Sequence, residues 1–175
     1  MTPPLEIRRL LEIDVRSRAE LTDVLLDCVA GGASVGFMAS LTRERATAFW
    51  ERVAADVAAG QRALLVAADD QGICGTVQLI LDMPDNQAHR ADLCKMLVHR
   101  RARRRGLGAA LMTAAENLAP ECGRSLLVLD AVSGGDAARL YARLGWTRVG
   151  DVPGYAVMPD GRPCGTTYFY RSVAR

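Results

Sequence analysis

The sequence contains a single lysine, Lys95, and the other 21 of its 22 basic residues are arginine. Aromatic residues make up only 5% of the chain, and 20 acidic residues nearly balance the basic ones. Proteins that bind nucleic acid commonly combine an excess of basic residues with aromatic side chains on which bases stack. This sequence lacks both features, and we therefore expect no nucleic-acid partner.

The sequence also lacks long hydrophobic runs and any cysteine pattern of a disulfide-rich or zinc-binding protein. No apolar stretch approaches the 18 or so residues that a membrane-spanning helix needs. Charged residues between positions 6 and 14 argue against a signal peptide. The five cysteines are at least 20 residues apart and are accompanied by only two histidines, which disfavours a metal site. We expect a cytoplasmic protein with no membrane partner and no metal.

The composition and length are those of an ordinary globular protein. Hydrophobic residues make up 50% of the 175 residues and charged residues 24%. No internal repeat or low-complexity linker interrupts the chain. The length favours one domain that spans residues 1–175.

Hydrophobic periodicity and turn residues predict the order of the secondary-structure elements. The pattern from Ser17 to Glu20 resembles a capping box that opens a first helix, and Gly31 would end it. Thr42 is expected to cap a second helix, and a third runs from Gly106 until Pro120 stops it. A short fourth helix follows Asp136. Strands are predicted at residues 5–11, 63–68, 73–81, 91–98, 126–129, 146–152 and 166–173.

This order, β-α-α-β-β-β-α-β-α-β-β, predicts an α/β fold. We expect a mixed, mostly antiparallel central sheet flanked by helices. The strand at residues 126–129 is apolar throughout, and we expect it to be buried on both faces.

The segment from Arg100 to Ala109, RRARRRGLGA, lies between a predicted strand and a predicted helix. Glycines at the start of a helix let the backbone approach a ligand, and the N–H groups there favour an anion. Five arginines in six positions add positive charge. The segment therefore predicts a pyrophosphate site, although a solvated arginine-rich turn is the alternative. It matches neither a Rossmann fingerprint nor a Walker A loop.

Two motifs resemble the GCN5-related N-acetyltransferases (GNAT). The spacing Arg103-x-x-Gly106-x-Gly108 is similar to the Gln/Arg-x-x-Gly-x-Gly/Ala signature of this family, which directly follows a strand. About thirty residues later, residues 137–146, AARLYARLGW, resemble its second signature, a helix with a tyrosine that ends at Gly-Phe/Trp. Together they cover about residues 91–150.

The resemblance implies transfer of an acetyl group from acetyl-CoA to an amine. It also implies that the donor is bound by Met96, Leu97, Val98, Arg103, Arg104, Arg105, Gly106, Leu107, Gly108 and Ala109. Members of the family commonly have an asparagine seven residues before the tyrosine, where this chain has Gly134. Ser133 or Asp136 could replace that contact.

Segments outside these signatures resemble one branch of the family, the tabtoxin-resistance acetyltransferases of plant-pathogenic bacteria. These segments are residues 31–38, 149–155, 158–161 and 167–169. The resemblance implies a small amine acceptor, such as an amino-acid-like toxin or antibiotic, and a monomer or homodimer. The small-residue loop at 31–38 favours a closed pocket. Acetylation of a protein N-terminus or lysine, and a non-catalytic acyl-CoA-binding regulator, remain alternatives.

Tyr141 is at the family position whose hydroxyl reaches the coenzyme sulfur, and the resemblance implies that it is the general acid. A phenol of pKa about 10 can protonate a thiolate of pKa about 8.5 at little cost. A tyrosine that only packs between helix and sheet is the alternative. Backbone N–H groups near Leu97 or Val98 could stabilise the oxyanion.

Asp130 follows the apolar strand at 126–129, at an end where ligands collect in α/β sheets. We expect burial to raise its pKa toward that of a usable base. It could act as the base or as an anchor for the amine, or it could be structural. Lys95 could snorkel to solvent or pair with Asp92 or Asp130, and a pair with Asp130 would favour the anchor.

Overall fold

The computed structural model describes residues 5–174 and confirms the predicted order of elements. The helices and strands are β1 (Glu6–Leu10), α1 (Val15–Ala30), α2 (Arg43–Ala58), β2 (Arg62–Asp69), β3 (Gly72–Ile80), β4 (Arg90–Val98), α3 (Leu107–Glu121), β5 (Leu126–Val132), α4 (Asp136–Arg143), β6 (Thr147–Val157) and β7 (Pro163–Ser172). The strands form a seven-stranded sheet in the order β1-β2-β3-β4-β5-β7-β6. Only β4 and β5 pair in parallel. The expected α/β fold with a mostly antiparallel sheet is therefore confirmed.

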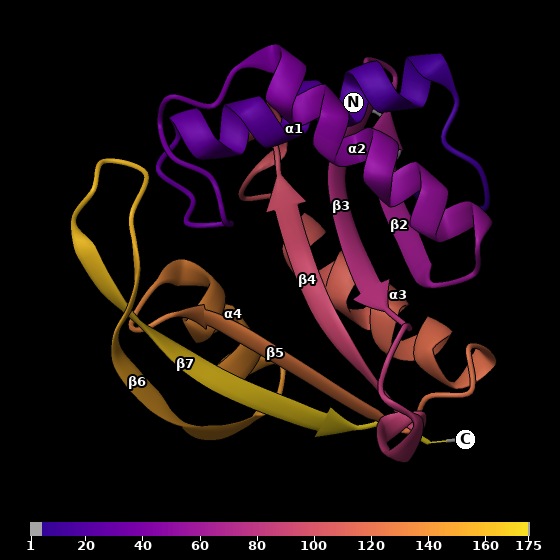
Figure 1. Cartoon of the computed structure of the whole chain (residues 1–175), viewed down its shortest axis with the longest axis vertical. Coiled ribbons are helices and arrows are strands. Elements are labelled where there is room, and N and C mark those ends of the chain that lie inside the picture. Colours follow the sequence, from indigo (N-terminus) through magenta and orange to yellow (C-terminus); the bar gives the residue numbers. More distant parts are fainter. Residues whose placement is uncertain (1–4, 175) are drawn as a thin grey trace.

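Two pairs of helices cover the two faces of the sheet (Figure 1). Strand β2 illustrates the alternation, because Leu64 and Val66 pack under α1 and α2 while Leu65 and Ala67 pack under α3. The core beneath α1 and α2 draws its strand residues from β1 to β4, and its last contribution is Leu97. On that face, strands β5 to β7 lie beyond the two helices, and this leaves room for a cavity.

The two N-terminal helices begin with side-chain caps, but the first cap differs from the prediction. Asp14 caps α1 and accepts a hydrogen bond from the Ser17 N–H at 2.7 Å. Ser17 therefore lies in the first turn, and Glu20 instead accepts from the Ile73 N–H at 2.9 Å. The predicted cap at Thr42 is confirmed by its bond to the Arg45 N–H.

Two further expectations were wrong. Pro120 does not stop α3 but lies inside it, and the chain leaves the helix at Gly123, whose φ of +73° suits a glycine. Strand β5 is not buried on both faces, because Leu127 and Leu129 are buried while Leu126 and Val128 are partly exposed. A helix covers only one face of this strand.

Candidate functional site

Strands β4 and β5 separate along their length and open a gap in the sheet. They pair only at Arg90–Leu126, Ala91–Leu127 and Asp92–Val128, and then diverge (Figure 1). Beyond this point β4 contains a bulge, since Lys95 and Met96 stand opposite the single residue Val77 of β3. A bulge bends a strand and turns its side chains to new directions. The gap and the bulge together define the centre of the site.

Helix α3 follows β4 after the arginine-rich connection at residues 99–106. Its cap, Gly106, has a φ of +74°, and the first intrahelical bond runs from the Ala110 N–H to the Gly106 carbonyl. The N–H groups of residues 107–109 have no partner within the helix, and such groups favour an anion. A Cβ on Gly106 would meet no heavy atom of the described chain within 4 Å. Glycine is needed there for its backbone conformation, and the space beside it is open.

The second glycine of the motif has a different role. A Cβ on Gly108 would lie 3.1 Å from Leu140 Cδ2 and 3.7 Å from Met96 Sδ. Gly108 therefore permits close contact between α3, α4 and strand β4. Leu107 is buried in the same core, and Ala109 is partly exposed.

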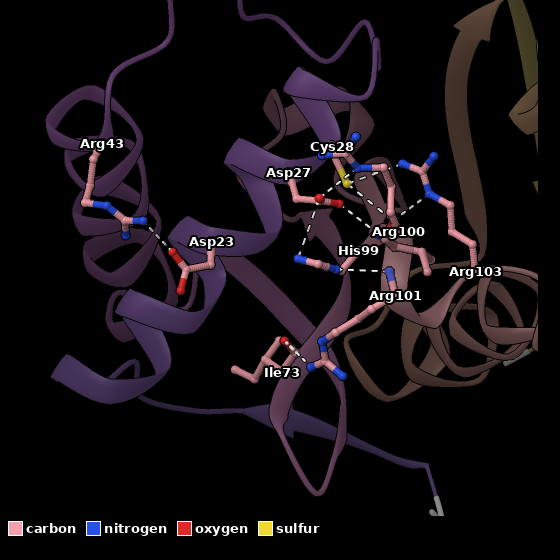
Figure 2. Close-up of polar contacts among 10 residues, drawn as sticks. Asp23, Asp27, Cys28, Arg43, Ile73, His99, Arg100, Arg101 and Arg103 are labelled. Atoms are coloured by element: carbon pink, nitrogen blue, oxygen red, sulfur yellow. Dashed lines mark hydrogen bonds and ion pairs between the residues drawn. The ribbon is translucent and has the colours of Figure 1, made fainter. Parts of the chain in front are cut away.

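Three of the five arginines of this segment form ion pairs with aspartates. The carboxylate of Asp27 on α1 accepts from the backbone N–H and the Nε of Arg100, both at 2.8 Å (Figure 2). Burial alone would raise the pKa of Asp27, but these two hydrogen bonds outweigh it and lower the pKa. The pair ties the connection after β4 to α1.

A second aspartate, Asp69, forms ion pairs with two more arginines. The side chain of Asp69 is only 3% exposed and lies 2.5 Å from Arg101 Nη1 and 3.7 Å from Arg105 Nη1. Burial opposes ionisation of Asp69, but the bond from Arg101 and the Gln71 N–H outweigh burial and lower its pKa. Neither aspartate was expected from the sequence as a partner of these arginines, because each is far along the chain from the arginines it binds.

Arg103 points back to the end of β4. Its Nε donates to the Val98 carbonyl at 3.0 Å, and the Cys28 thiol donates to the same carbonyl at 3.4 Å. Arg104 is exposed and has a φ of +61°, which is uncommon for a residue with a side chain. The backbone N–H groups and Arg104 are therefore the groups of this segment that best fit an anion.

One backbone N–H of β4 faces the gap. The His99 N–H donates to the Cys74 carbonyl on β3 at 2.9 Å. Successive residues of a strand direct their N–H groups to opposite sides, and the Val98 N–H therefore points away from β3. Leu97 is buried and pairs with Thr76.

Tyr141 lies on α4 and packs on the α3–α4 face of β5. It is 5% exposed, and its ring centroid is 6.0 Å from that of Phe169 and 6.1 Å from that of Trp146. Burial raises the pKa of Tyr141 well above its usual range, and the negative charge of Asp130 adds to this. The hydroxyl therefore keeps its proton at neutral pH.

Asp130 is exposed, and the expectation that it is buried was wrong. It lies inside β5, which continues to Val132. It faces the same side of the sheet as α1 and α2, but these two helices do not extend over β5. Its neighbour across the strands is Tyr168. One carboxylate oxygen accepts a hydrogen bond from the Thr166 hydroxyl at 2.7 Å, which fixes the carboxylate without neutralising it.

A cavity of about 260 Å³ lies beside Asp130. Strands β4 to β7 and the α1–α2 loop form its walls, with Lys95, Asp130, Tyr155, Thr166 and Cys94 among the lining residues. The loop closes onto the β6–β7 hairpin, because Ser34 Oγ donates to the Val157 carbonyl and the Ala39 N–H donates to the Pro159 carbonyl. Burial raises the pKa of the Cys94 thiol, which disfavours a nucleophilic thiolate.

Lys95 joins neither of its two expected partners. Asp92 pairs with Arg90, and Asp130 is bound by Thr166. Among residues 5–174 no carboxylate forms an ion pair with Lys95, whose Nζ lies 5.8 Å from the centroid of the Phe49 ring.

Tyr155 lines the cavity and contacts Tyr168, and neither residue was assigned a role from the sequence. The Tyr168 hydroxyl donates to the Tyr155 hydroxyl at 2.9 Å, and this bond, together with burial, raises the pKa of Tyr168 to about 12. Tyr155 lies on β6 and Tyr168 on β7. Both residues lie in the segments 149–155 and 167–169 that carry the family resemblance, but the β6–β7 pairing is irregular between Val152 and Ala156, and no regular register predicts their contact.

Residues 5–174 include neither a helix that could span a membrane nor a cluster of metal ligands. None of the helices there is both long and apolar enough to span a membrane. The same residues include no cluster of three or more His, Cys, Asp or Glu side chains that could hold a metal ion.

Residues 60–148, about half of the chain, match the family model of the GNAT acetyltransferase domain. The chain belongs to the GNAT acetyltransferase family. The matched part includes β4, the α3 N-terminus, Asp130 and Tyr141. This GNAT protein is therefore an acetyltransferase, and acetyl-CoA is its acetyl donor.

Solved structures with the same fold extend the likeness over nearly the whole chain. The structure of yncA from Salmonella typhimurium with its cofactor acetyl-CoA has a TM-score of 0.80 at 21% identity, over 98% of this chain and 95% of that one. A candidate phosphinothricin N-acetyltransferase has a TM-score of 0.79 at 19% identity, over 98% and 100%. A ribosomal-protein-alanine N-acetyltransferase from Brucella melitensis has a TM-score of 0.78 at 18% identity, over 96% and 99%. At these identities the likeness shows the fold.

Proposed function

We propose that this GNAT protein, acting as one domain, acetylates the amine of a small molecule in the cytoplasm, where acetyl-CoA is available. The observation that carries this proposal is the small cavity of about 260 Å³ next to the β4–β5 gap. The α1–α2 loop is bonded to the β6–β7 hairpin through Ser34 and Ala39, and a polypeptide acceptor would need an open groove there.

An amino-acid-like toxin or antibiotic is the acceptor class that the sequence resemblance to tabtoxin-resistance acetyltransferases favours. The segments that carry this resemblance include the α1–α2 loop and the β6–β7 hairpin, and both contribute residues to the cavity wall. The shared fold of the candidate phosphinothricin N-acetyltransferase is compatible with this class. Fold alone does not determine the substrate.

The α3 N-terminus and the gap fit acetyl-CoA. When bound, this donor supplies an acetyl thioester, an activated acyl group with a thiolate leaving group. We assign its pyrophosphate to the N–H groups of Leu107, Gly108 and Ala109, with Arg104 and Arg105 beside them, because the space next to Gly106 is open. Met96, Leu97 and Val98 belong to the part of β4 that does not pair with β5.

Three groups of the chain meet the chemical demands of acetyl transfer, and they are the Val98 N–H, Tyr141 and Asp130. The Val98 N–H points into the gap, where it can donate to an oxyanion. Tyr141 holds a proton on its hydroxyl on the α4 side, and a general acid must be protonated before it acts. Because its pKa is raised, full transfer of this proton is more costly than for an ordinary phenol, and a hydrogen bond to the leaving sulfur is the step that we propose.

Asp130 serves as the anchor for the acceptor amine. It is exposed, lines the cavity and is held by Thr166. Attraction of an ammonium group is the role that the exposed position of this carboxylate favours. The ammonium must then lose a proton to water or to Asp130 before it attacks.

Acetylation of a protein N-terminus is the second candidate function. The shared fold of the ribosomal-protein-alanine N-acetyltransferase makes it worth testing, although the small size of the cavity disfavours it. A non-catalytic acyl-CoA-binding regulator is the third.

A screen of acceptors by release of free thiol from acetyl-CoA tests these candidates directly. It should include amino acids, aminoglycosides, polyamines and short peptides with free N-termini. We expect turnover with small amines and little with peptides. Preference for peptides would refute the small-molecule proposal, and saturable acetyl-CoA binding without turnover of any acceptor would favour the regulator.

A further inference from the structure

The single lysine of the chain lies at the acceptor cavity. Lys95 is partly buried in the cavity wall, next to the α1–α2 loop, and its Nζ is 3.9 Å from the position that a Cβ on Gly36 would take. The Nζ atom also lies 5.8 Å from the centroid of the Phe49 ring on α2, and the Phe37 ring of the loop packs edge-on against Phe49 with the two centroids 5.4 Å apart. The ammonium group therefore lies near both the α1–α2 loop and α2.

The bulge in β4 is responsible for this position. Before the bulge, Ala91 and Leu93 pack in the core beneath α3, and a regular strand would direct Lys95 to the same side. Lys95 instead has a φ of +51°, an uncommon conformation for a residue with a side chain. Such strained conformations persist where the surrounding structure requires them, and they cluster at functional sites.

The charge of Lys95 is not neutralised by the protein. Among residues 5–174 it forms no ion pair, and of the two carboxylates expected as partners Asp92 pairs with Arg90 and Asp130 accepts from Thr166. The face of an aromatic ring attracts a cation, but the three N–H donors of the ammonium group remain available for a ligand. A partly buried cation in a cavity favours an anionic partner.

We propose that Lys95 binds a carboxylate of the acceptor, and that the substrate is therefore a small zwitterion related to an amino acid. This inference rests on the proposed function and deepens it. The acceptor carboxylate contacts Lys95 on β4, while its amine lies at Asp130 on β5. Drug-sized ligands occupy pockets of about 300–1,000 Å³, and a cavity of about 260 Å³ suits a smaller molecule of this kind.

Paired acceptors test this inference with the unmodified protein. Each standard amino acid would be compared with its C-terminal amide, which keeps the side chain and the amine but loses the negative charge. The amine of an amide is less basic and offers more of its neutral form, and so it should react faster if no group binds the carboxylate. We expect the amino acid to have a kcat/KM about 10- to 100-fold above that of its amide, as for one charged hydrogen bond.

The matching variants are Lys95→Met, Lys95→Arg and, as a control for loss of a surface cation, Arg8→Met on β1. In Lys95→Met the preference for the acid over the amide should disappear, mainly through KM. Lys95→Arg should keep part of it, and Arg8→Met should keep all of it. A preference that survives in Lys95→Met would overturn the inference.

A second readout does not depend on turnover. Because Lys95 is the only lysine, protein labelled with [ε-¹³C]lysine should give one side-chain ε signal in NMR spectra. We expect this signal to shift saturably with the amino acids and not with their amides. Acetylation of small amines without such a shift would overturn the inference and leave the proposed function intact. The shift without any turnover would refute the proposed function alone. Acetylation of Lys95 itself, detected by mass spectrometry, would also overturn the inference.

Discussion

Tyr141 of α4 packs on one face of strand β5, and Asp130 of β5 points to the opposite face. Tyr141 packs with Leu127 and Leu129 on the face of β5 that α3 and α4 cover, whereas Asp130 points to the face that α1 and α2 leave open. The gap between β4 and β5 connects the two faces. This arrangement allows a proton donor and an amine anchor to approach one reacting group from two sides.

The Gly106→Glu variant should abolish saturable binding of acetyl-CoA, measured by isothermal titration calorimetry. Glutamate would strain a backbone with φ +74° and would put a negative charge beside the N–H groups of α3. Gly60→Glu is the matched control, since Gly60 ends α2 with a φ of +71° and no heavy atom of the described chain lies within 4 Å of its Cβ position. Equal binding by both variants would contradict the assignment of the pyrophosphate site.

The Tyr141→Phe variant should lower kcat by about 10²-fold and change the affinity for acetyl-CoA little. Only the hydroxyl is lost, and the ring keeps its packing against Phe169 and Trp146. Steady-state kinetics with a good acceptor would measure this effect. Tyr170→Phe, on the exposed part of β7, is the control and should leave kcat unchanged. If Tyr141→Phe turned over at the parental rate while chemistry is rate-limiting, the proposed hydrogen bond from Tyr141 to the leaving sulfur would be excluded.

The Asp130→Asn variant separates the anchor from a general base. As an anchor, Asp130 contributes a fixed charge to acceptor binding, and the variant should raise KM by about 10-fold or more with a smaller change in kcat. A fall in kcat with loss of the acidic limb of the pH–rate profile would instead identify a base. Unchanged values of both constants across neutral pH would show that Asp130 is structural.

The Asp27→Asn variant should destabilise the protein by about 2 kcal/mol near neutral pH, because the hydrogen bonds to Arg100 lose their charge. The pKa of Asp27 is lowered in the folded state, so this stabilisation is complete above the unfolded pKa of about 3.9. It is lost as the pH falls below that value through the folded pKa. Urea unfolding at several pH values should show the two proteins converging in acid.

Asp23→Asn provides the matched control for that experiment. Asp23 lies one turn earlier on α1, and its bridge to Arg43 is 56% and 60% exposed on the two side chains (Figure 2). Exposed bridges contribute about 0–1 kcal/mol, so this variant should change stability little. A loss equal to that of Asp27→Asn would mean that general charge on α1, rather than the bond to Arg100, stabilises the fold.

The sequence by itself determined the features that depend on local spacing. The order of the elements follows from hydrophobic periodicity, because helices and strands have different repeats. Residues that cap helices, such as Gly31 and Thr42, mark where helices end or begin. The two GNAT motifs depend on the spacing of Gly106, Gly108 and Tyr141 along the chain, and the family match confirms the membership that they indicated.

Only the tertiary structure decided which charges are paired and which face the cavity. Arg100 and Arg101 find Asp27 and Asp69, partners 73 and 32 residues away, and no local pattern predicts such contacts. Asp130 is exposed because β5 lies beyond α1 and α2, and Lys95 reaches the cavity because a bulge against β3 changes the direction of its side chain. These outcomes depend on which elements become neighbours, and the free energy of a charged group depends on those neighbours.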